Sequence, residues 1–259
     1  MSLAEIVDLS KYPINSDEFR ATQRTNLDEN GVVVLPGFIL DNALAAIQAE
    51  SEAVEEQAYF CAQNHSVYLT PPDPSFGADH PANRQVVSSK GCVCDDVVAK
   101  DSPLRQLYDD PTFRSFITAT TGETELHPYA DPLSSINIHY AKTGQELGWH
   151  FDNSEFAITL LIRKPEAGSR FEYIKNLRDA EAGEMNYEGV SALLDNKTRP
   201  EVLTMDAGAL VLFRGRNSVH RVSPNEGTTT RILAVLAYNS EPGVELSESA
   251  RMTFYGRLT

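Results

Sequence analysis

The chain has 259 residues, a length that one large domain can hold, since all-β barrels of this size are commonly undivided. Hydrophobic residues make up 41% of it and charged residues 23%, which excludes a wholly disordered or fibrous protein. Acidic residues outnumber basic ones 37 to 22, and the formal charge of −15 repels phosphate backbones and anionic lipids. We therefore expect neither a nucleic-acid partner nor a membrane-surface partner.

Cysteine usage and the composition of the N-terminus indicate the compartment. The three cysteines, Cys61, Cys92 and Cys94, are an odd number, which implies no disulfide framework and suits a reducing environment. Residues 1–20 lack the basic and apolar regions of a signal peptide, and no apolar run approaches the ~20 residues that span a bilayer. We expect a soluble cytoplasmic protein, whose oligomeric state the sequence does not indicate. The Cys92-x-Cys94 pair has no second pair of thiols, so it is a poor zinc signal.

Residues 1–120 show a mostly helical pattern, which predicts an N-terminal helical layer. Capping side chains and a glycine that can adopt the left-handed conformation mark several of the expected helix ends. The elements expected, in chain order, are a helix over 17–30 closed by Gly31, a short extended run over 32–35, a helix over 41–58 capped by Asp41, a loop over 70–83, and one or two short helices over 101–120.

From about residue 133 the pattern changes to short runs rich in β-branched and aromatic residues, separated by Gly, Pro and Asn. Short strands with turns between them favour a sandwich or barrel over a parallel βαβ sheet. We therefore expect a single domain over 1–259, mainly β with N-terminal helices (α+β), whose core lies in 121–259. A polar stretch over 176–200 interrupts the strands and could be a covering flap or a surface excursion. The strands expected are 135–141, 149–162, 170–174, 209–213, 219–222 and 231–239.

One short motif stands out once the familiar ones have been sought. The dinucleotide, P-loop, nucleophile-elbow and zincin motifs are all missing, and His150-Phe151-Asp152 remains. Alternate residues of a strand point to the same face, so the His150 imidazole and the Asp152 carboxylate can address one point. Such a pair is common by chance, and on its own it indicates no more than a surface pair.

The surroundings of this pair favour a metal site. His150 and Asp152 precede the strongest strand signal of the chain, 156–162, and His220 follows another apolar run. Two imidazole nitrogens and one carboxylate form the facial triad that suits iron(II) and leaves coordination positions open. Those positions could hold a bidentate 2-oxo acid and then dioxygen. Arg231, at the start of a further apolar strand, could pair with the far carboxylate of such a co-substrate or form a structural salt bridge.

Four segments carry a family resemblance: 148–162 (GWHFDNSEFAITLLI), 171–173 (FEY), 212–216 (LFRGR) and 220–222 (HRV). Together they resemble the iron(II)/2-oxoglutarate-dependent oxygenases. Within that superfamily they look most like the BesD/HalD-type enzymes, which halogenate or hydroxylate free amino acids. The likeness covers roughly residues 120–257, about half of the chain.

The resemblance implies a double-stranded β-helix (jelly roll) with N-terminal helices packed outside its larger sheet. It also implies that His150, Asp152 and His220 bind Fe(II) and that Arg231 binds the distal carboxylate of 2-oxoglutarate. The implied reaction uses dioxygen and couples decarboxylation of 2-oxoglutarate to hydroxylation of an unactivated C–H bond.

The residue at position 152 bears on the type of reaction. Halogenases of this branch carry glycine or alanine where Asp152 stands, which leaves a coordination site for chloride. A carboxylate that fills this site leaves no place for the halide. We therefore expect a hydroxylase rather than a halogenase.

Further residues near these motifs are candidates for binding the co-substrate or the substrate. Asn137 and His139 lie two apart on one strand, so they share a face and could hold the co-substrate's inner carboxylate or orient a ligand. Satisfied polar groups at a barrel mouth would show the same spacing. Trp149 points to the opposite face from His150, where packing is its default role. The remaining candidates are Thr159 for the co-substrate, and Asn153, Glu155 and Arg84 for the substrate.

The sequence thus predicts a dioxygenase that hydroxylates a small polar metabolite, most simply a free amino acid or a derivative. The alternatives are a hydroxylase of a peptide, protein or carrier-bound residue, and a non-catalytic metal-binding jelly roll. A compact acidic chain without an evident docking segment favours the small substrate, and the complete set of ligands argues against loss of activity. A cupin-type enzyme would need a further histidine such as H-x-H, and Asp152 occupies that position.

Overall fold

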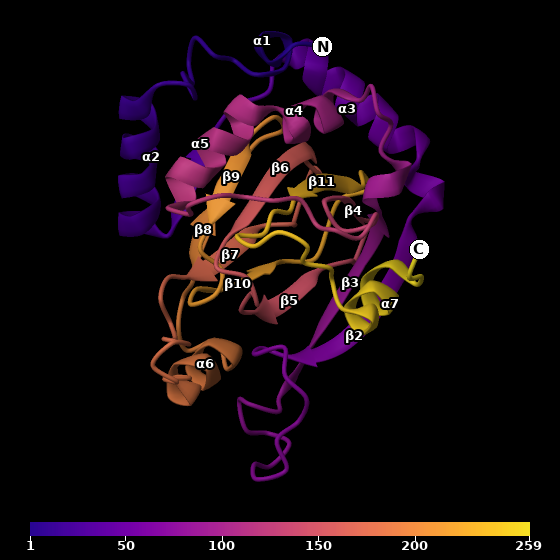
Figure 1. Cartoon of the computed structure of the whole chain (residues 1–259). Helices are drawn as coiled ribbons and strands as arrows, with labels where there is room; N and C mark the ends of the chain where they lie inside the picture. The colour runs from indigo at the N-terminus through magenta and orange to yellow at the C-terminus, as the bar shows by residue number, and fades with distance from the viewer.

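The computed structural model describes residues 1–259 and shows eleven strands joined in one strongly curved sheet (Figure 1). The strand order is β1-β9-β6-β11-β4-β3-β5-β10-β7-β8, and β2 pairs with β3 beside this path. The strands are β1 (Val32–Leu35), β2 (Tyr59–Ser66), β3 (Gln85–Val93), β4 (Ile136–Ala141), β5 (Leu147–His150), β6 (Ala157–Arg163), β7 (Phe171–Ile174), β8 (Glu201–Leu203), β9 (Leu210–Phe213), β10 (Val219–Val222) and β11 (Arg231–Leu236).

The sheet folds over at β3. Gly91–Val93 of this strand pair with β4, whereas Ser88, nearer its start, pairs with β5. Strand β3 is therefore shared between a larger half of β1, β9, β6, β11 and β4 and a smaller half of β5, β10, β7 and β8. The two halves form the layers of a jelly roll, as the sequence resemblance implied (Figure 1).

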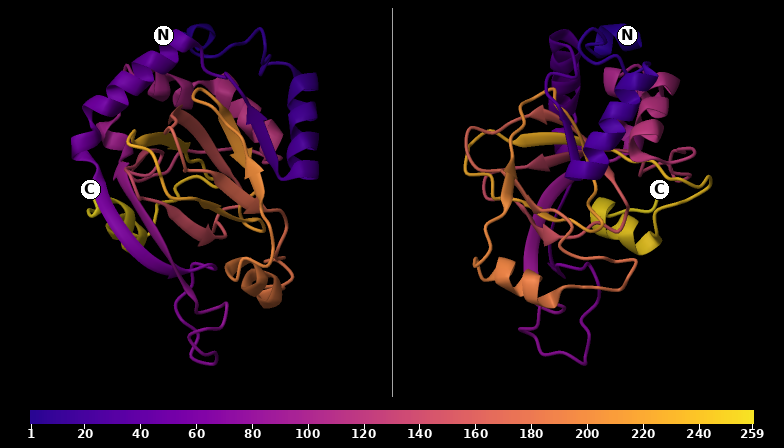
Figure 2. Two further views of the ribbon diagram at one scale, coloured as in Figure 1. Left: turned by 180° about the vertical axis from the view of Figure 1, so that it is seen from behind. Right: turned by 90° about the vertical axis from the view of Figure 1, so that its left-hand side faces the viewer.

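The N-terminal helices cover the outer face of the larger half (Figure 2). Their apolar side chains and those of β4, β6, β9 and β11 form one cluster of 31 buried residues, which joins the helical layer to the sheet. None of the helices combines the length and the hydropathy that crossing a lipid bilayer would require. The helices are α1 (Leu3–Ile6), α2 (Asp17–Asn30), α3 (Asp41–Ala53), α4 (Pro103–Asp109), α5 (Pro111–Thr121), α6 (Tyr187–Leu194) and α7 (Glu248–Tyr255), with 3-10 turns η1 (Glu55–Gln57) and η2 (Asp95–Val97).

Local chemistry sets the helix ends. At the start of α2 the Ser16 hydroxyl accepts a hydrogen bond from the Phe19 N–H, and Gly31 ends the helix at φ +73°. Asp110 begins α5 in a similar way, because its carboxylate accepts two backbone N–H groups. The predicted helix over 17–30 and the two short helices before residue 122 are confirmed.

The predicted helix over 41–58 is correct in kind and in its first residue, but the capping role given to Asp41 and the end of the helix are wrong. Helix α3 ends at Ala53, and Asp41 is its first residue, preceded by Leu40 without a side-chain cap. The chain ends the helix early because it turns through η1 into β2, where Tyr59 begins a strand.

The expectation of a mostly helical N-terminal region also needs correction. Strands β2 and β3 form a hairpin on either side of the predicted loop over 70–83, which is confirmed, and β1 joins the larger half of the sheet. The two hairpin strands carry many Ser, Gln, Asn, His and Lys residues, so they lack the apolar alternation that identifies a strand in a sequence.

Two further segments differ in detail from the prediction. The run over 149–162 is two strands, β5 and β6, so Asp152 lies in the turn after β5 rather than on a strand. The polar stretch over 176–200 contains α6, whose Val190 and Leu193 pack against the end of the smaller half. This stretch therefore covers the sheet and is not an excursion away from it.

A hydrogen bond from Tyr140 connects the sheet to the helical layer, and its removal tests how much this contact contributes to stability. Its side chain is buried in β4, and its hydroxyl donates to the Ser51 carbonyl of α3 at 2.6 Å. We expect Tyr140→Phe to lower the free energy of unfolding by about 1 kcal/mol, because a buried carbonyl loses a partner. Tyr59→Phe alters a ring that is 42% exposed and should change it by less than about 0.5 kcal/mol. Urea unfolding measures both, and equal losses would contradict the assignment.

Candidate metal centre

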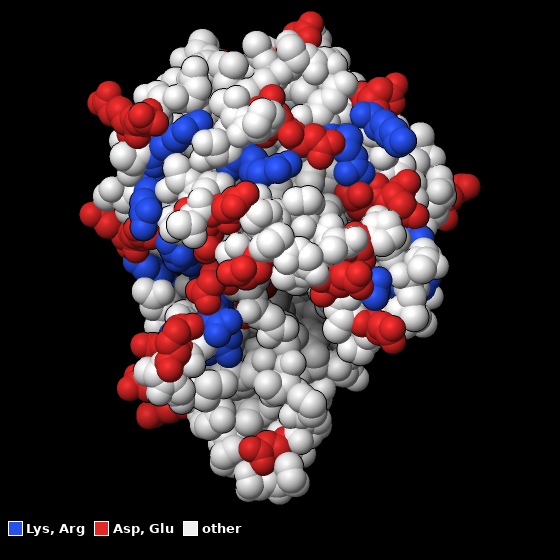
Figure 3. Space-filling model, viewed as in Figure 1, with Lys and Arg blue, Asp and Glu red and all other residues white.

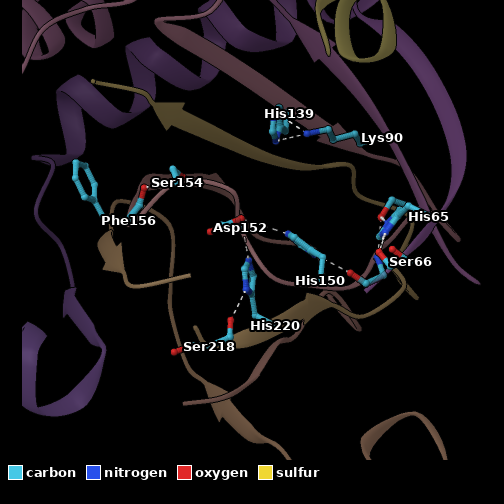
Figure 4. A network of polar contacts seen from close by, with 12 residues as sticks. His65, Ser66, Lys90, His139, His150, Asp152, Ser154, Phe156, Ser218 and His220 are labelled. Carbon is cyan, nitrogen blue, oxygen red and sulfur yellow. Dashed lines mark hydrogen bonds and ion pairs between the residues drawn. The ribbon is translucent and has the colours of Figure 1, made fainter. Parts of the chain in front are cut away.

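Strand pairing brings the three predicted metal ligands together. His150 ends β5 and lies directly opposite His220 of the antiparallel strand β10, and Asp152 follows two residues after β5. The Nε2 atoms of both imidazoles lie 3.6 Å from Oδ1 of Asp152. One ligand atom from each residue lies within 4.8 Å of the other two (Figure 4). His220, 68 positions after Asp152 in the chain, therefore converges with His150 and Asp152 on one point, as predicted.

Backbone carbonyls orient the two imidazoles. Nδ1 of His150 donates to the Gly148 carbonyl at 2.8 Å, and Nδ1 of His220 donates to the Ser218 carbonyl at 3.0 Å. A carbonyl only accepts, so Nδ1 carries a proton in both rings, and Nε2 is the nitrogen directed at the common point.

The fold leaves room for the Asp152 carboxylate beside these nitrogens. Its backbone N–H donates to the Gly215 carbonyl at 3.1 Å, and its Oδ2 is buried without a hydrogen-bond partner. A Cβ at position 215 would lie 1.8 Å from Oδ2, so glycine there allows the Asp152 carboxylate its position. A buried carboxylate with so few donors is costly, and a cation bound at Oδ1, between the two imidazoles, would offset its charge.

Electrostatics keep His150 in the form that binds a metal. Burial lowers its pKa well below the usual value, and the neighbouring His220 acts in the same direction, against the hydrogen bond to the Gly148 carbonyl. The ring is therefore neutral at physiological pH. Two imidazoles and one carboxylate that approach from one side are the donor set that suits iron(II), and they leave positions for ligands other than side chains.

Arg231 begins strand β11, as the sequence predicted, and lies opposite Ala141 of β4. Its side chain is only 6% exposed, and burial lowers its pKa to about 10, so the guanidinium remains charged at neutral pH. No acidic side chain forms an ion pair with it. A buried guanidinium without an anion is costly, which fits its predicted role as the partner of a co-substrate carboxylate.

The predicted co-substrate residues share the face of Arg231. Asn137 and Thr159 both lie opposite Val235, on the two strands that flank β11. His139 lies two residues after Asn137 on β4, and Arg231 lies four residues before Val235 on β11. Side chains an even number of residues apart on a strand share a face, so all four side chains point to the interior of the jelly roll.

Asn137 is already satisfied by the protein. Its amide donates to the carbonyls of Leu133 and Ile136, both at 2.8 Å, and its oxygen accepts from the hydroxyl of Tyr255 at 2.8 Å. This residue fits the structural interpretation better than a role in holding the co-substrate.

The substrate candidates next to the motif lie in different surroundings. Trp149 is buried on the opposite side of β5 from His150, beneath the guanidinium of Arg221 at 4.7 Å from its ring centroid. Asn153 and Glu155 are exposed in the turn after the motif, and Glu155 forms an ion pair with an arginine at 2.9 Å.

Arg84 is engaged away from the triad. Its guanidinium binds the Asp195 carboxylate at 2.6 Å and the Leu194 carbonyl at 3.1 Å. It therefore ties the segment after the loop over 70–83 to the end of α6, and its expected role with a substrate carboxylate stays a prediction.

Sequence reasoning missed two cations near the site. The Nζ of Lys90 lies 3.0 and 3.2 Å from the two ring nitrogens of His139 (Figure 4). Arg178 stacks over the Phe151 ring at 4.2 Å and donates to the Asp152 carbonyl at 3.4 Å. Lys90 could have been found only by recognising β3 as a strand, and Arg178 comes from a polar stretch with no periodic signal.

Solved structures with this fold include several oxygenases. A 2OG-Fe(II) oxygenase-family oxidoreductase from Burkholderia pseudomallei matches with a TM-score of 0.54, 14% identity, and coverage of 87% of this chain and 93% of that one. The epimerase SnoN from nogalamycin biosynthesis, solved with Fe3+, alpha-ketoglutarate and nogalamycin RO, matches with a TM-score of 0.58, 13% identity, and coverage of 86% and 84%. A Pseudomonas putida prolyl-4-hydroxylase matches with a TM-score of 0.51, 12% identity, and coverage of 83% and 96%. At these identities the likeness establishes the shared fold.

The jelly roll and its two-histidine, one-carboxylate centre define an iron(II)/2-oxoglutarate-dependent oxygenase. The model of one family, Halogenase D, matches residues 15–253. The chain belongs to the Halogenase D family. No curated protein matches it by sequence.

The ligand assignment predicts the outcome of removing one imidazole. We expect His150→Ala to weaken Fe(II) binding by more than about 100-fold, since even changes to groups that merely support a ligand cost 10- to 100-fold. His127, whose ring lies near Glu125, provides the matched control in His127→Ala. Anaerobic equilibrium dialysis with Fe(II) measures both variants. Unchanged binding by His150→Ala would contradict the assignment.

Proposed function

We propose that this protein hydroxylates an unactivated C–H bond of a small polar metabolite, a free amino acid or a derivative of one. His150, Asp152 and His220 hold iron(II) from one side, and Arg231 binds the distal carboxylate of 2-oxoglutarate. Bound iron(II) supplies the oxidation, in which dioxygen gives one oxygen atom to succinate, formed with loss of carbon dioxide, and the other to the substrate.

The observation that carries the choice of hydroxylation is the position of Asp152. Its Oδ1 is equally close to both imidazole nitrogens, at 3.6 Å, and Gly215 makes room for the carboxylate. A carboxylate in this position acts as the third ligand and takes the place that a halide would need. The family name refers to a halogenase, so this residue argues for a different reaction within the same family.

The surroundings of the site support a small substrate. Acidic and basic side chains are interspersed over the face seen in Figure 3, and no continuous basic surface forms on it. Residues of the stretch over 176–200 pack beside the triad, where Arg178 reaches the Asp152 carbonyl. Side chains of this cover would exclude bulk water from the reacting atoms.

A peptide or carrier-bound residue is the second candidate substrate. The prolyl-4-hydroxylase from Pseudomonas putida has the same fold, so this architecture does not by itself restrict the size of the substrate. Turnover of free amino acids compared with peptides, read as succinate release, separates the two candidates.

A screen of free amino acids and related amines tests the proposed reaction. With iron(II), 2-oxoglutarate and dioxygen, we expect one substrate to gain a single oxygen atom, with one succinate formed per product, measured by mass spectrometry. Asp152→Gly should reduce hydroxylation by at least about 100-fold, because the third iron ligand is lost. Asp206→Gly, at a side chain that is 78% exposed, is the matched control. Full hydroxylation by Asp152→Gly, or a chlorinated product from the unaltered protein, would contradict the proposal.

The role of Arg231 predicts a selective effect on the co-substrate. We expect Arg231→Gln to weaken 2-oxoglutarate binding by about 100-fold or more, because breaking a buried ion pair costs several kcal/mol. Iron(II) binding should stay unchanged. Arg163→Gln removes a guanidinium that binds Glu52 at 2.6 Å instead and serves as the control. Anaerobic titration calorimetry measures the affinities, and equal affinity in the unaltered protein and Arg231→Gln would refute the role.

A further inference from the structure

We propose that Lys90 binds a carboxylate of the substrate, in a cavity that lies on the interior face of the larger sheet half beneath α7. The substrate is accordingly a small molecule that carries one carboxylate. This inference rests on the proposed function and names the chemical group by which the same site recognises its substrate.

The cavity has the size and lining for a small organic acid. It encloses about 200 Å³ between β3, β4, β11 and the C-terminal segment. Lys90 is the one charged residue of its lining, next to the polar His139, Asn137 and Ser134, and apolar or aromatic contacts come from residues such as Val235, Ala237 and Phe254. One cationic group set against apolar and aromatic side chains is suited to an anionic group on an aliphatic body.

Lys90 has no acidic partner in the protein. Protein atoms enclose it deeply, yet it keeps some accessible surface because it faces the cavity. Its ammonium contacts the His139 ring and lies 5.4 Å from the ring centroid of Phe254. Burial lowers the pKa of Lys90, and the charges of Cys92, Cys61 and Asp152, the one carboxylate among them, counteract this effect. An enclosed ammonium that contacts only a ring and an aromatic face is an incomplete arrangement.

His139 does not neutralise this charge. Burial lowers its pKa well below the usual value, and the charges of Lys90 and Arg231 act in the same direction. The ring is therefore neutral and can accept a hydrogen bond from the ammonium. It orients Lys90 and leaves its positive charge without a counter-charge.

The balance of charges inside the jelly roll indicates that Lys90 pairs with an anion other than 2-oxoglutarate. Iron(II) and Arg231 together carry three positive charges, and Asp152 and doubly charged 2-oxoglutarate carry three negative charges. Of the two other cations near the triad, Arg178 stacks on Phe151 and donates to the Asp152 carbonyl, whereas Lys90 faces the cavity without an acidic partner. A single carboxylate on the substrate would match the charge of Lys90. A doubly charged phosphate would leave an excess negative charge beside Asp152, so the arrangement favours the carboxylate.

Lys90 and Arg231 serve different pockets. Arg231 of β11 lies opposite Ala141 of β4, and Gly91 of β3 lies opposite Tyr140. Continuing this register places Lys90 opposite Ala141 as well, so Lys90 and Arg231 lie on either side of the same residue, on strands about 10 Å apart. From this position the ammonium of Lys90 turns to His139 and Phe254, whereas Arg231 does not line their cavity. One co-substrate carboxylate at Arg231 therefore leaves Lys90 free for another ligand.

The test measures binding without turnover. The iron(II)- and 2-oxoglutarate-loaded protein is titrated anaerobically with each free L-amino acid and with the corresponding L-amino-acid amide, by calorimetry. We expect at least one amino acid to bind about 10-fold or more tightly than its amide, because the amide lacks the charge that pairs with the ammonium. Lys90→Met should bind the two alike, and Lys90→Arg should keep the preference for the acid.

Two controls distinguish substrate binding by Lys90 from a general effect of losing a lysine and from 2-oxoglutarate binding. Lys164→Met removes a lysine that binds Asp206 on the surface and should leave every affinity unchanged. Lys90→Met should bind 2-oxoglutarate within about twofold of the unaltered protein, a change too small for a lost buried ion pair.

Three results would overturn the inference. They are an unaltered protein in which no acid binds more tightly than its amide, a Lys90→Met variant that keeps the preference, and a Lys90→Met variant that loses affinity for 2-oxoglutarate. The acid–amide comparison in the unaltered protein needs no variant, so it holds even where Lys90→Met fails to fold. Failure of the proposed function is a separate outcome, since it is seen as the lack of hydroxylated product when dioxygen is admitted to the same complexes.

Discussion

The register between β5 and β10 is the constraint on which the site depends. It places His150 opposite His220, and β7 fixes β10 from the other side by pairing Tyr173 with His220. A slip of one residue would turn each imidazole to the opposite face of the sheet. The rings of Phe171 and Phe213 pack against the His220 ring, with centroids 5.5 and 4.8 Å away, and add a steric reason for the same register. Strand pairing therefore sets the positions of the two imidazoles, and the turn after β5 adds the Asp152 carboxylate beside them.

The interior face of the jelly roll carries charged side chains inside an apolar shell. The outer face of the larger sheet half is buried under the N-terminal helices, whereas its inner face presents Lys90, His139 and Arg231. The buried positive charges of Lys90 and Arg231 lower the stability of the protein without ligands and raise its affinity for anions. Binding of iron(II), 2-oxoglutarate and a carboxylate substrate would balance the charges of Asp152, Arg231 and Lys90. The binding of each of these ligands would therefore affect the affinity for the others.

Much of the second half of the chain was predictable because its local signals agree. The runs that became β4, β6, β9 and β11 are apolar on the side that faces the helices, and the turns between them carry glycine, proline and asparagine. The hairpin of β2 and β3 was missed for the opposite reason. Its strands carry many polar side chains, among them Lys90, so the hydrophobic period that marks a strand is absent. Lys90 was missed together with the strand that positions it.

The sequence by itself determined the chemistry that is available: an ordered set of His150, Asp152, His220 and Arg231, placed next to apolar runs that had to become strands. Only the tertiary structure decided which side chains share a cavity. It brought Lys90 to His139 across 49 positions and took Arg84 to Asp195 across 111, away from the triad. The physical reason is that local patterns specify the faces of individual strands, whereas the curvature of the sheet and the pairing of distant strands determine which of those faces meet.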